Sequence, residues 1–206
     1  GLCPNGSDRQ SGAGAAEDDA GHGTHVTAII ASRGNQSAVG VAPGTEIVSI
    51  KVTAGPSFSG VFYYFSEVVA GLDFIINSRP DVQVINMSLV TNAIFAGTCD
   101  NSTSWAMAGA SAVNALWANG VIAFASSGNT GSGTYMTAPA CLSNVISVGA
   151  TDNADAVASF TSSNATTDIM APGVSILSSD LANGTKTASG TSMASPHAAG
   201  CAALLL

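Results

Sequence analysis

Four short apolar runs along the chain are typical of buried β-strands. Each contains valine or isoleucine and little charge, and none shows a sustained alternation of apolar and polar residues. Runs of this kind favour strands that are covered on both faces. The predicted strands are residues 46–52, 82–89, 121–127 and 145–150.

Between and around these runs lie longer stretches with helical character. Because strands and helices alternate, we expect an α/β fold with three layers, in which a mostly parallel sheet has helices on both faces. In such sheets, functional sites gather at the carboxyl ends of the strands. Asn119-Gly120 predicts the end of one helix. The predicted helices are residues 24–32, 61–78, 103–118 and 192–206.

Residues 1–20 have little periodicity and are predicted to form a loop-like lead-in to a single partial domain that spans residues 1–206. The chain starts at Gly1 without a methionine and stops inside an apolar helical run that has no cap. We therefore expect a fragment of a longer protein, truncated at both ends, with no signal peptide in the part shown.

The composition narrows the class of protein. Apolar residues make up 46% of the 206 residues, enough to bury a sizeable core, and the net charge is −8 with only five Lys and Arg. This balance argues against a nucleic-acid partner, and no apolar run is long enough to span a membrane. We expect a secreted monomer.

The chain has four cysteines, which allow three pairings if all are oxidised. None forms a CxxC pair, which argues against a zinc site. Cys99 and Cys141 lie in loop-like, polar contexts, so we predict a disulfide between them. Cys201 is expected to be a small buried residue of the last helix. A cytosolic protein with free thiols, Cys3 included, is the alternative.

One serine lies in a setting that permits catalysis. Ser192 follows Gly190-Thr191 and opens the last helix, where small neighbours allow a substrate to approach. The free N–H groups of a helix N-terminus stabilise an oxyanion beside it. Pro196 is expected near the first turn, where its missing N–H costs little. The alternative is an ordinary serine N-cap.

A serine nucleophile needs a base and oxyanion donors. His22, between two glycines at the start of a helix, is the best base among the three histidines, because His25 and His197 lie inside helices. Asn129 follows a predicted strand, so its amide and the Ser192 N–H are candidate donors. The alternative for Asn129 is a turn residue. A phosphate loop is disfavoured, because SSGNTGSG lacks a GK[ST] ending.

Together, GHGTHV (21–26), SSGN (126–129) and GTSMASPH (190–197) resemble the motifs of the subtilisin-like serine protease family, the subtilases. The resemblance extends to residues 39–52, 84–89, 145–152 and 170–177. It implies a serine endopeptidase that acts through an acyl-enzyme, with Ser192 as nucleophile, His22 as general base and acid, and Asn129 as oxyanion donor. His25 and His197 match structural histidines.

The resemblance also implies how a protein or peptide substrate binds, as an added strand between two enzyme segments. One segment would be Ser88-Leu89 with Val90, and the opposing one Ser59-Gly60. Ser127-Gly128 would form part of the wall of the specificity pocket. Pro139 matches a position that is often cis in the family.

The chain departs from the family pattern at its catalytic aspartate, which belongs to a D-[ST]-G motif well upstream of the histidine. Only 21 residues precede His22, and they contain no such motif. Asp8 is a poor candidate, and Asp18 and Asp19 are expected to be solvent-facing loop residues. The fragment alone is therefore expected to be nearly inactive.

The chain departs from the family at two further places. Val90-Thr91 stands where Gly-Gly is usual, so we do not expect the specificity of close relatives to transfer, and Ala28 replaces a glycine. We expect no required cofactor. Many relatives bind calcium in the loop that corresponds to residues 32–40, so a structural calcium ion is a candidate there, although Asn35 is its one candidate side-chain ligand and the loop contains no carboxylate.

Two other functions stay open. A subtilase-fold binding module without catalysis would keep the same fold, and the upstream sequence would distinguish it from the enzyme. A serine hydrolase with chymotrypsin-like order would use Asp73, Asp81 or Asp100, but it would need two β-barrels in place of an α/β fold.

Overall fold

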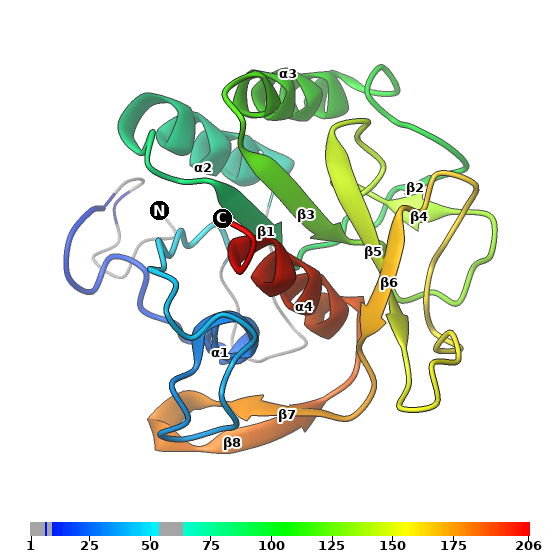
Figure 1. The fold of residues 1–206 in the computed structure, drawn as a ribbon. Helices are drawn as coiled ribbons and strands as arrows, with labels where there is room; N and C mark the ends of the chain where they lie inside the picture. The colour runs from blue at the N-terminus through cyan, green and yellow to red at the C-terminus, as the bar shows by residue number, and fades with distance from the viewer. Residues whose placement is uncertain (1–6, 8–9, 54–63) are drawn as a thin grey trace.

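The computed structural model describes Ser7 and residues 10–53 and 64–206. Its centre is a four-stranded sheet with the order β1-β3-β5-β6, in which every neighbouring pair is parallel. The fold therefore confirms the predicted parallel sheet (Figure 1). The strands are β1 (Val84–Met87), β3 (Ile122–Ser126), β5 (Val145–Thr151) and β6 (Ile169–Pro172).

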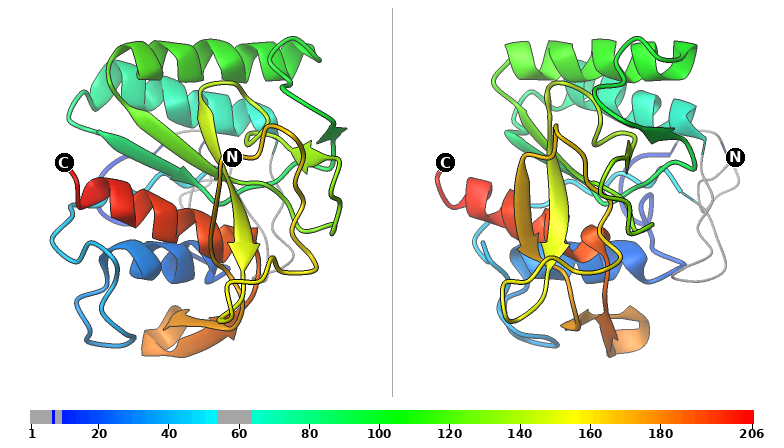
Figure 2. Two further views of the ribbon diagram at one scale, coloured as in Figure 1. Left: turned by 45° about the vertical axis from the view of Figure 1, so that its right-hand side comes forward. Right: turned by 90° about the vertical axis from the view of Figure 1, so that its right-hand side faces the viewer.

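Helices cover both faces of this sheet. Helices α2 and α3 lie together on one face, and α4 packs against the other with α1 beside it (Figures 1 and 2). The three-layer α/β architecture is thus confirmed. The helices are α1 (His22–Ala31), α2 (Phe65–Ser78), α3 (Ser104–Ala118) and α4 (Thr191–Ala203). In the described part of the chain, no helix is both long and apolar enough to cross a bilayer.

Side chains along each strand alternate between two apolar cores. On β3, Ala123 and Ala125 face the core under α2 and α3, whereas Phe124 faces the core under α4. Both faces of the central strand are therefore buried, which explains why its sequence is an almost unbroken apolar run.

The boundaries of α3 follow from its capping residues. The Thr103 side chain accepts a hydrogen bond from the Ala106 N–H at 3.1 Å, which satisfies one of the free donors of the first turn. At the other end the helix stops at Asn119, and Gly120 takes the left-handed conformation with a φ of 81°. The helix end predicted at Asn119-Gly120 is confirmed.

Several short strands were not predicted. β6 joins the main sheet at its edge and ends in Pro172, whose missing N–H is tolerated at an edge. The others form two antiparallel pairs, β2 with β4 and β7 with β8, and are too short to show a period. They are β2 (Ile94–Phe95), β4 (Met136–Thr137), β7 (Ile176–Ser179) and β8 (Thr185–Ala188), with the 3-10 helix η1 (Leu181–Asn183) between the last two.

The strand predicted at residues 46–52 is wrong. The segment has no regular secondary structure, although its sequence has high strand propensity. A strand requires a hydrogen-bonded neighbour, and among the described residues none pairs with this segment. Its side chains Ile50 and Val52 still pack against the core under α2 and α3.

The cysteine predictions divide into one that is confirmed and one that is wrong. Cys99 and Cys141 form the predicted disulfide. Near Cys141, the Ala138–Pro139 peptide bond is cis, as was also expected. Cys201 is exposed and not buried, because it lies on the face of α4 that is turned away from the sheet. Cys3 lies outside the described residues.

Loss of the disulfide should destabilise the chain. Because the bond closes a loop with a sequence separation of 42, the double variant C99A/C141A should lose about 2–4 kcal/mol of unfolding free energy. C201A, which removes an exposed thiol, is the control and should change it little. Urea denaturation under non-reducing conditions measures both, and equal stability of the two variants would contradict this prediction.

Candidate active site

Two of the three stretches selected from the sequence, SSGN and GTSMASPH, meet at one end of the parallel sheet, and the third begins the helix packed beside α4. Ser88 follows β1 directly and Ser127 follows β3. Because the two strands are parallel neighbours, their carboxyl ends lie at the same end of the sheet. Helix α4 begins with Thr191 at this end, where the Ser88 hydroxyl reaches the Ser192 carbonyl. Helix α1, which begins with His22, packs against α4.

Ser192 is the second residue of α4 and is half-buried. Its hydroxyl lies 3.5 Å from the Ser88 carbonyl oxygen, which accepts from it. The N–H groups of a helix's first turn have no partner within the helix. The Met193 N–H donates to the Gly190 carbonyl oxygen at 3.0 Å, whereas the Ser192 N–H is the first-turn donor next to the Ser192 hydroxyl.

The side chain of Asn129 is oriented by Thr191. The Asn129 Oδ1 accepts hydrogen bonds from the Thr191 backbone N–H at 2.8 Å and from its hydroxyl at 2.9 Å. A methyl group placed on Gly190 would lie 3.6 Å from Asn129 Oδ1 and 3.7 Å from both Asn129 Nδ2 and the Ser192 nitrogen. The Asn129 amide and the Ser192 N–H therefore border the same space, and two donors that border one space are what an oxyanion site requires.

Thr191 was not singled out from the sequence, although it fixes Asn129. Its hydroxyl also accepts a hydrogen bond from the Gly128 N–H at 3.2 Å, so that one side chain ties the end of β3 to the start of α4. A threonine immediately before a helix-opening serine was the only signal that could have indicated this role.

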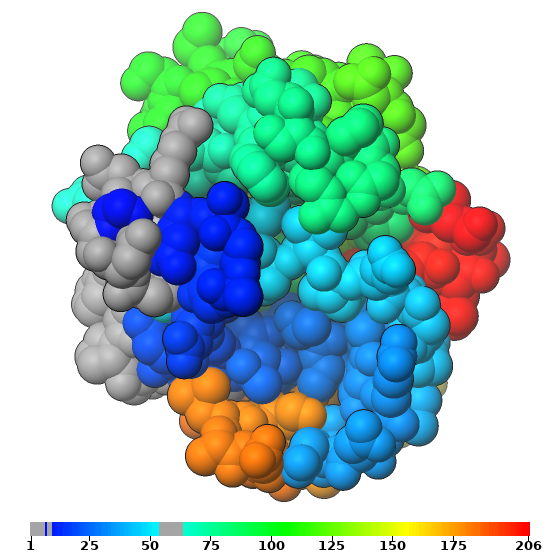
Figure 3. All heavy atoms as spheres, turned by 90° about the vertical axis from the view of Figure 1, so that its left-hand side faces the viewer, coloured from blue at the N-terminus to red at the C-terminus, as the bar shows by residue number. Residues whose placement is uncertain are grey.

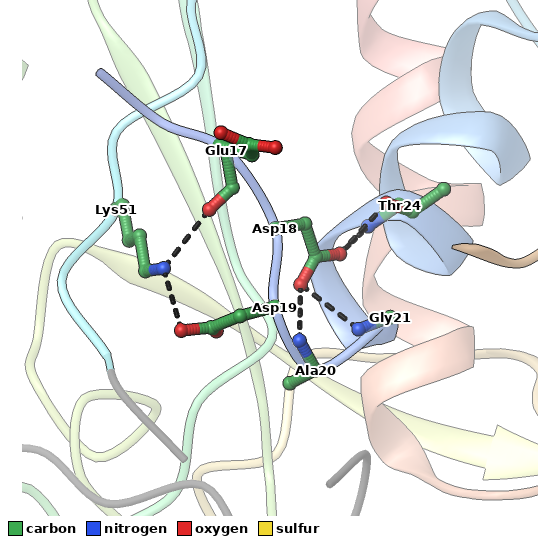
Figure 4. A network of polar contacts seen from close by, with 7 residues as sticks. All are labelled: Glu17, Asp18, Asp19, Ala20, Gly21, Thr24 and Lys51. Carbon is green, nitrogen blue, oxygen red and sulfur yellow. Dashed lines mark hydrogen bonds and ion pairs between the residues drawn. The ribbon is translucent and has the colours of Figure 1, made fainter. Parts of the chain in front are cut away.

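His22 is held by the loop that precedes it. Gly21 precedes the helix with a φ of 84°, a left-handed conformation that a glycine adopts without strain, and its lack of a side chain leaves the helix without a cap there. Asp18 supplies the cap instead. One carboxylate oxygen accepts from the Thr24 N–H and hydroxyl, and the other from the Ala20 and Gly21 N–H groups (Figure 4).

The expectation that Asp18 faces solvent is therefore wrong. Its carboxylate fixes the backbone on both sides of His22, with bonds of 2.7 to 3.0 Å. Burial raises the pKa of Asp18, but these hydrogen bonds, that of the Thr24 hydroxyl first, outweigh it and hold the pKa below its ordinary value. No local signal in the sequence indicates this role, because Asp18 lies six residues before Thr24, whereas the residues of a capping box are three apart.

Asp19 is exposed, as expected, and forms an ion pair with Lys51 at 3.0 Å. The same ammonium group donates to the Glu17 carbonyl oxygen at 2.9 Å (Figure 4). These two contacts join the segment before α1 to the 46–52 segment. Asp8 lies outside the described residues, so the structure assigns it no position.

The electrostatic surroundings favour a neutral imidazole at His22. Burial lowers the pKa of His22, the neighbouring His25 lowers it further, and the negative charge of Asp18 opposes both. A neutral imidazole at pH 7 is the form that can accept a proton from a hydroxyl.

The two other histidines make contacts that suit structural residues. His25 is buried, and its Nε2 donates to the Lys186 carbonyl oxygen at 3.0 Å. The His197 Nδ1 donates to the Met193 carbonyl oxygen at 2.8 Å, one turn earlier in α4. Burial lowers the pKa of both imidazoles, so each is neutral near pH 7.

The predicted substrate segments lie beside the start of α4 where they are described. Ser88 is buried, and the Leu89 carbonyl accepts from the Ser126 hydroxyl at 3.1 Å, which fixes the segment that leads to the half-buried Val90. Ser59 and Gly60, predicted as the opposing segment, lie outside the described residues.

The predicted pocket wall at Ser127-Gly128 is closely packed. Gly128 has a φ of 121°, and a methyl group there would come within 3.0 to 3.2 Å of Ser162 and Thr137 atoms, so only glycine fits. The Ser127 hydroxyl is buried and has no hydrogen-bond partner among the described residues. An unpaired buried hydroxyl is rare and marks this wall as a place to look for a ligand contact.

A cavity of about 1260 Å³ opens beside β1. Among the described residues β1 pairs only with β3, and its other edge borders this cavity. Figure 3 shows that face of the molecule hollowed between the N-terminal segment and the 41–53 segment. His22 and Ser88 both line the cavity, together with apolar side chains of the 46–52 segment and of α2.

The loop at residues 32–40 offers few side-chain ligands for a calcium ion. Asn35 is exposed, and the Ser37 hydroxyl is hydrogen-bonded to the hydroxyls of Ser32 and Ser179. Nowhere in the described ranges do three or more His, Cys, Asp or Glu side chains form a group that could hold a metal. A calcium site in this loop stays a prediction.

The fold is that of a three-layer α/β protein in which Asn129 and the start of α4 with Ser192 are joined at the carboxyl end of the sheet, and His22 begins a helix packed against α4. The family model described as the subtilase family (Peptidase_S8) matches residues 5–206. The chain therefore belongs to the subtilase family, whose members are serine proteases.

Individual relatives agree with this membership. Subtilisin DY of Bacillus licheniformis is 41% identical over 193 residues, and Subtilisin Savinase of Lederbergia lenta is 39% identical over 190 residues. Each match covers 92% of this chain but only 64% of the relative, so the chain spans less than two thirds of their length. The crystal structure of a cold adapted subtilisin-like serine proteinase is similar, with a TM-score of 0.77 and 34% identity over 94% of this chain and 63% of that one.

Removing the charge of Asp18 should affect α1 and His22 together. In D18N the amide nitrogen cannot accept a hydrogen bond, so two of the four bonds are lost, and the unfolding free energy should fall by about 1–2 kcal/mol. The pKa of His22 should fall further, because the charge that raises it is gone. Urea denaturation and an NMR titration of the imidazole measure these effects.

D19N is the matched control, because it removes the same charge from the next residue. It breaks only the exposed ion pair with Lys51 and should cost less than about 1 kcal/mol, with a smaller change of the His22 pKa. Equal effects of D18N and D19N would show that Asp18 does not hold the loop.

Proposed function

We propose that the protein to which residues 1–206 belong is a secreted serine endopeptidase that cleaves protein or peptide substrates. Ser192 would attack the scissile carbonyl, and His22 would take the hydroxyl proton and later deliver it to the leaving amine. The observation that carries the proposal is the shared space beside Gly190, which Asn129 Nδ2 and the Ser192 N–H both border.

These two donors would stabilise the negative charge that develops on the carbonyl oxygen. Thr191 supports this role, because its N–H and hydroxyl occupy the Asn129 oxygen and leave the amide nitrogen as the group that can donate to a substrate. The depressed pKa of His22 supports a neutral imidazole that is ready to act as base.

The substrate would lie as an extended strand along Ser88, Leu89 and Val90, with its side chain before the cut against Ser127 and Gly128. The half-buried Val90 would narrow or displace one wall of the pocket, so the specificity of relatives with glycine there is not expected to transfer. Ser59 and Gly60 are proposed for the opposite side of the strand.

The orienting carboxylate is proposed to come from a segment outside residues 1–206. Asp18 is committed to capping α1, and Asp19 pairs with Lys51. The cavity beside β1 is the proposed place of this segment. The cavity borders His22 and the side of β1 that pairs with no strand among the described residues. A strand added there in the parallel sense would end near Ser88.

The disulfide supports secretion, because such bonds persist mainly in oxidising compartments. We also propose that residues 1–206 form part of one peptidase domain, with 1–20 as its lead-in, and that the protein is a monomer without a required cofactor. A binding module without catalysis is the alternative, since it would keep the same fold.

Comparing two chains on one peptide substrate tests the proposal. Residues 1–206 alone should hydrolyse a chromogenic peptide about 10⁴-fold more slowly than the whole protein, because the imidazole lacks its orienting carboxylate. The Ser192→Ala variant of the whole protein gives the background rate.

Equal rates for both chains would show that no outside carboxylate is needed. A folded whole protein that hydrolyses no faster than its Ser192→Ala variant would favour the binding module.

A further inference from the structure

Pro196 leaves a gap in the hydrogen bonding of α4. It is the sixth residue of the helix and not part of its first turn, so the expectation that its missing N–H costs little is wrong. In an α-helix the N–H of residue 196 would donate to the carbonyl of residue 192. The Ser192 carbonyl therefore loses its helical partner in a region where Ala194, Ser195 and Pro196 are buried.

The Ser88 hydroxyl takes the place of the missing N–H. This hydroxyl donates to the Ser192 carbonyl oxygen at 2.7 Å. Ser88 is buried, with a relative exposure of 8%. A buried carbonyl without a partner is costly, so this bond repairs the defect that the proline creates.

The Ser88 hydroxyl is held in turn by a short chain of hydrogen bonds. It accepts from the Asn86 amide nitrogen at 3.0 Å, and the Asn86 oxygen accepts from the Ser195 hydroxyl at 2.6 Å. Ser192 and Ser195 are three residues apart and so lie on one face of α4. The chain of bonds joins this face to β1 at two points.

We propose that the Ser88 hydroxyl is a positioning group for Ser192, standing in for the backbone N–H that Pro196 removes. Ser88 holds this residue from two sides, because its hydroxyl binds the Ser192 carbonyl and its own carbonyl accepts from the Ser192 hydroxyl at 3.5 Å. The effect of Ser88 on catalysis rests on the proposed function. Its replacement of the missing N–H of Pro196 does not.

A double-mutant cycle in the whole protein tests the proposed replacement of the missing Pro196 N–H by the Ser88 hydroxyl. Ser88→Ala removes the hydroxyl that donates to the buried Ser192 carbonyl and should lower the folding equilibrium constant about tenfold. In the Pro196→Ala background, the new N–H of residue 196 can reach that carbonyl, so the same change should cost less than about threefold. Ser88→Thr keeps the hydroxyl and should stay near the unmodified chain.

Ser178→Ala is the matched control. The Ser178 hydroxyl is buried and donates to a backbone carbonyl in the same way, that of His25 at 2.8 Å, but far from Pro196 in the sequence. Ser178→Ala should lower the folding equilibrium constant by a similar factor with and without Pro196→Ala, because Pro196→Ala supplies no donor for the His25 carbonyl. Equal costs of Ser88→Ala in the two backgrounds would overturn the proposal.

A spectroscopic signature reports on the carbonyl directly. Ser192-Met193 is the only Ser-Met pair in the chain, so labelling serine with ¹³C at the carbonyl and methionine with ¹⁵N gives one carbonyl–amide NMR signal. The carbonyl shift should move upfield in Ser88→Ala and return toward its original value in Ser88→Ala/Pro196→Ala. An unmoved shift in Ser88→Ala would also overturn the proposal.

The whole protein adds a catalytic readout. Ser88→Ala should lower kcat with little change of KM, and Pro196→Ala should restore part of it, whereas Ser178→Ala should change neither. An unchanged kcat in Ser88→Ala would overturn the positioning role. Inactivity of the unmodified protein would instead count against the proposed function, because the stability and NMR results do not depend on hydrolysis.

Discussion

The close contact between α4 and the parallel sheet is the constraint on which the site depends. Small side chains allow it, since Ala194, Ala198 and Ala199 form the helix side of the core. Gly173, directly after β6, lies close to the start of the helix, where a methyl group would come within 2.8 Å of the Gly190 carbonyl oxygen and 3.3 Å of the Ala194 Cβ. Bulkier residues would lift the helix from the strands and separate Ser192 from the strand ends beside it.

Hydrogen bonds then convert this packing into a defined geometry. Thr191 ties the start of α4 to the end of β3, and Ser88 ties it to the end of β1. Asp18 does the same for the start of α1 through Thr24. Each of these side chains acts on the backbone next to a candidate catalytic residue, so the site is built by polar contacts that the apolar pattern does not encode.

The sequence therefore predicts the layers better than it predicts the site's supports. The three paired strands and the four helices were found because their apolar runs and helix ends are local signals, as at Asn119-Gly120. The strand predicted at residues 46–52 was wrong because a strand forms only with a hydrogen-bonded partner, whatever the propensity of its residues. The prediction that Cys201 is buried was wrong because alanines occur on all sides of α4, so the sequence does not indicate which face is exposed. His22, Ser192 and Asn129 were selected through motifs, whereas Thr191 and Asp18 act through contacts that only the fold reveals.

The central claim is that Ser192 is a nucleophile, and covalent labelling of the whole protein tests it most directly. A fluorophosphonate probe, followed by peptide mapping in a mass spectrometer, should place a single adduct on the peptide that contains Ser192 and none on the Ser192→Ala variant. An adduct that persists in that variant, or a folded protein that takes no label at all, would contradict the account.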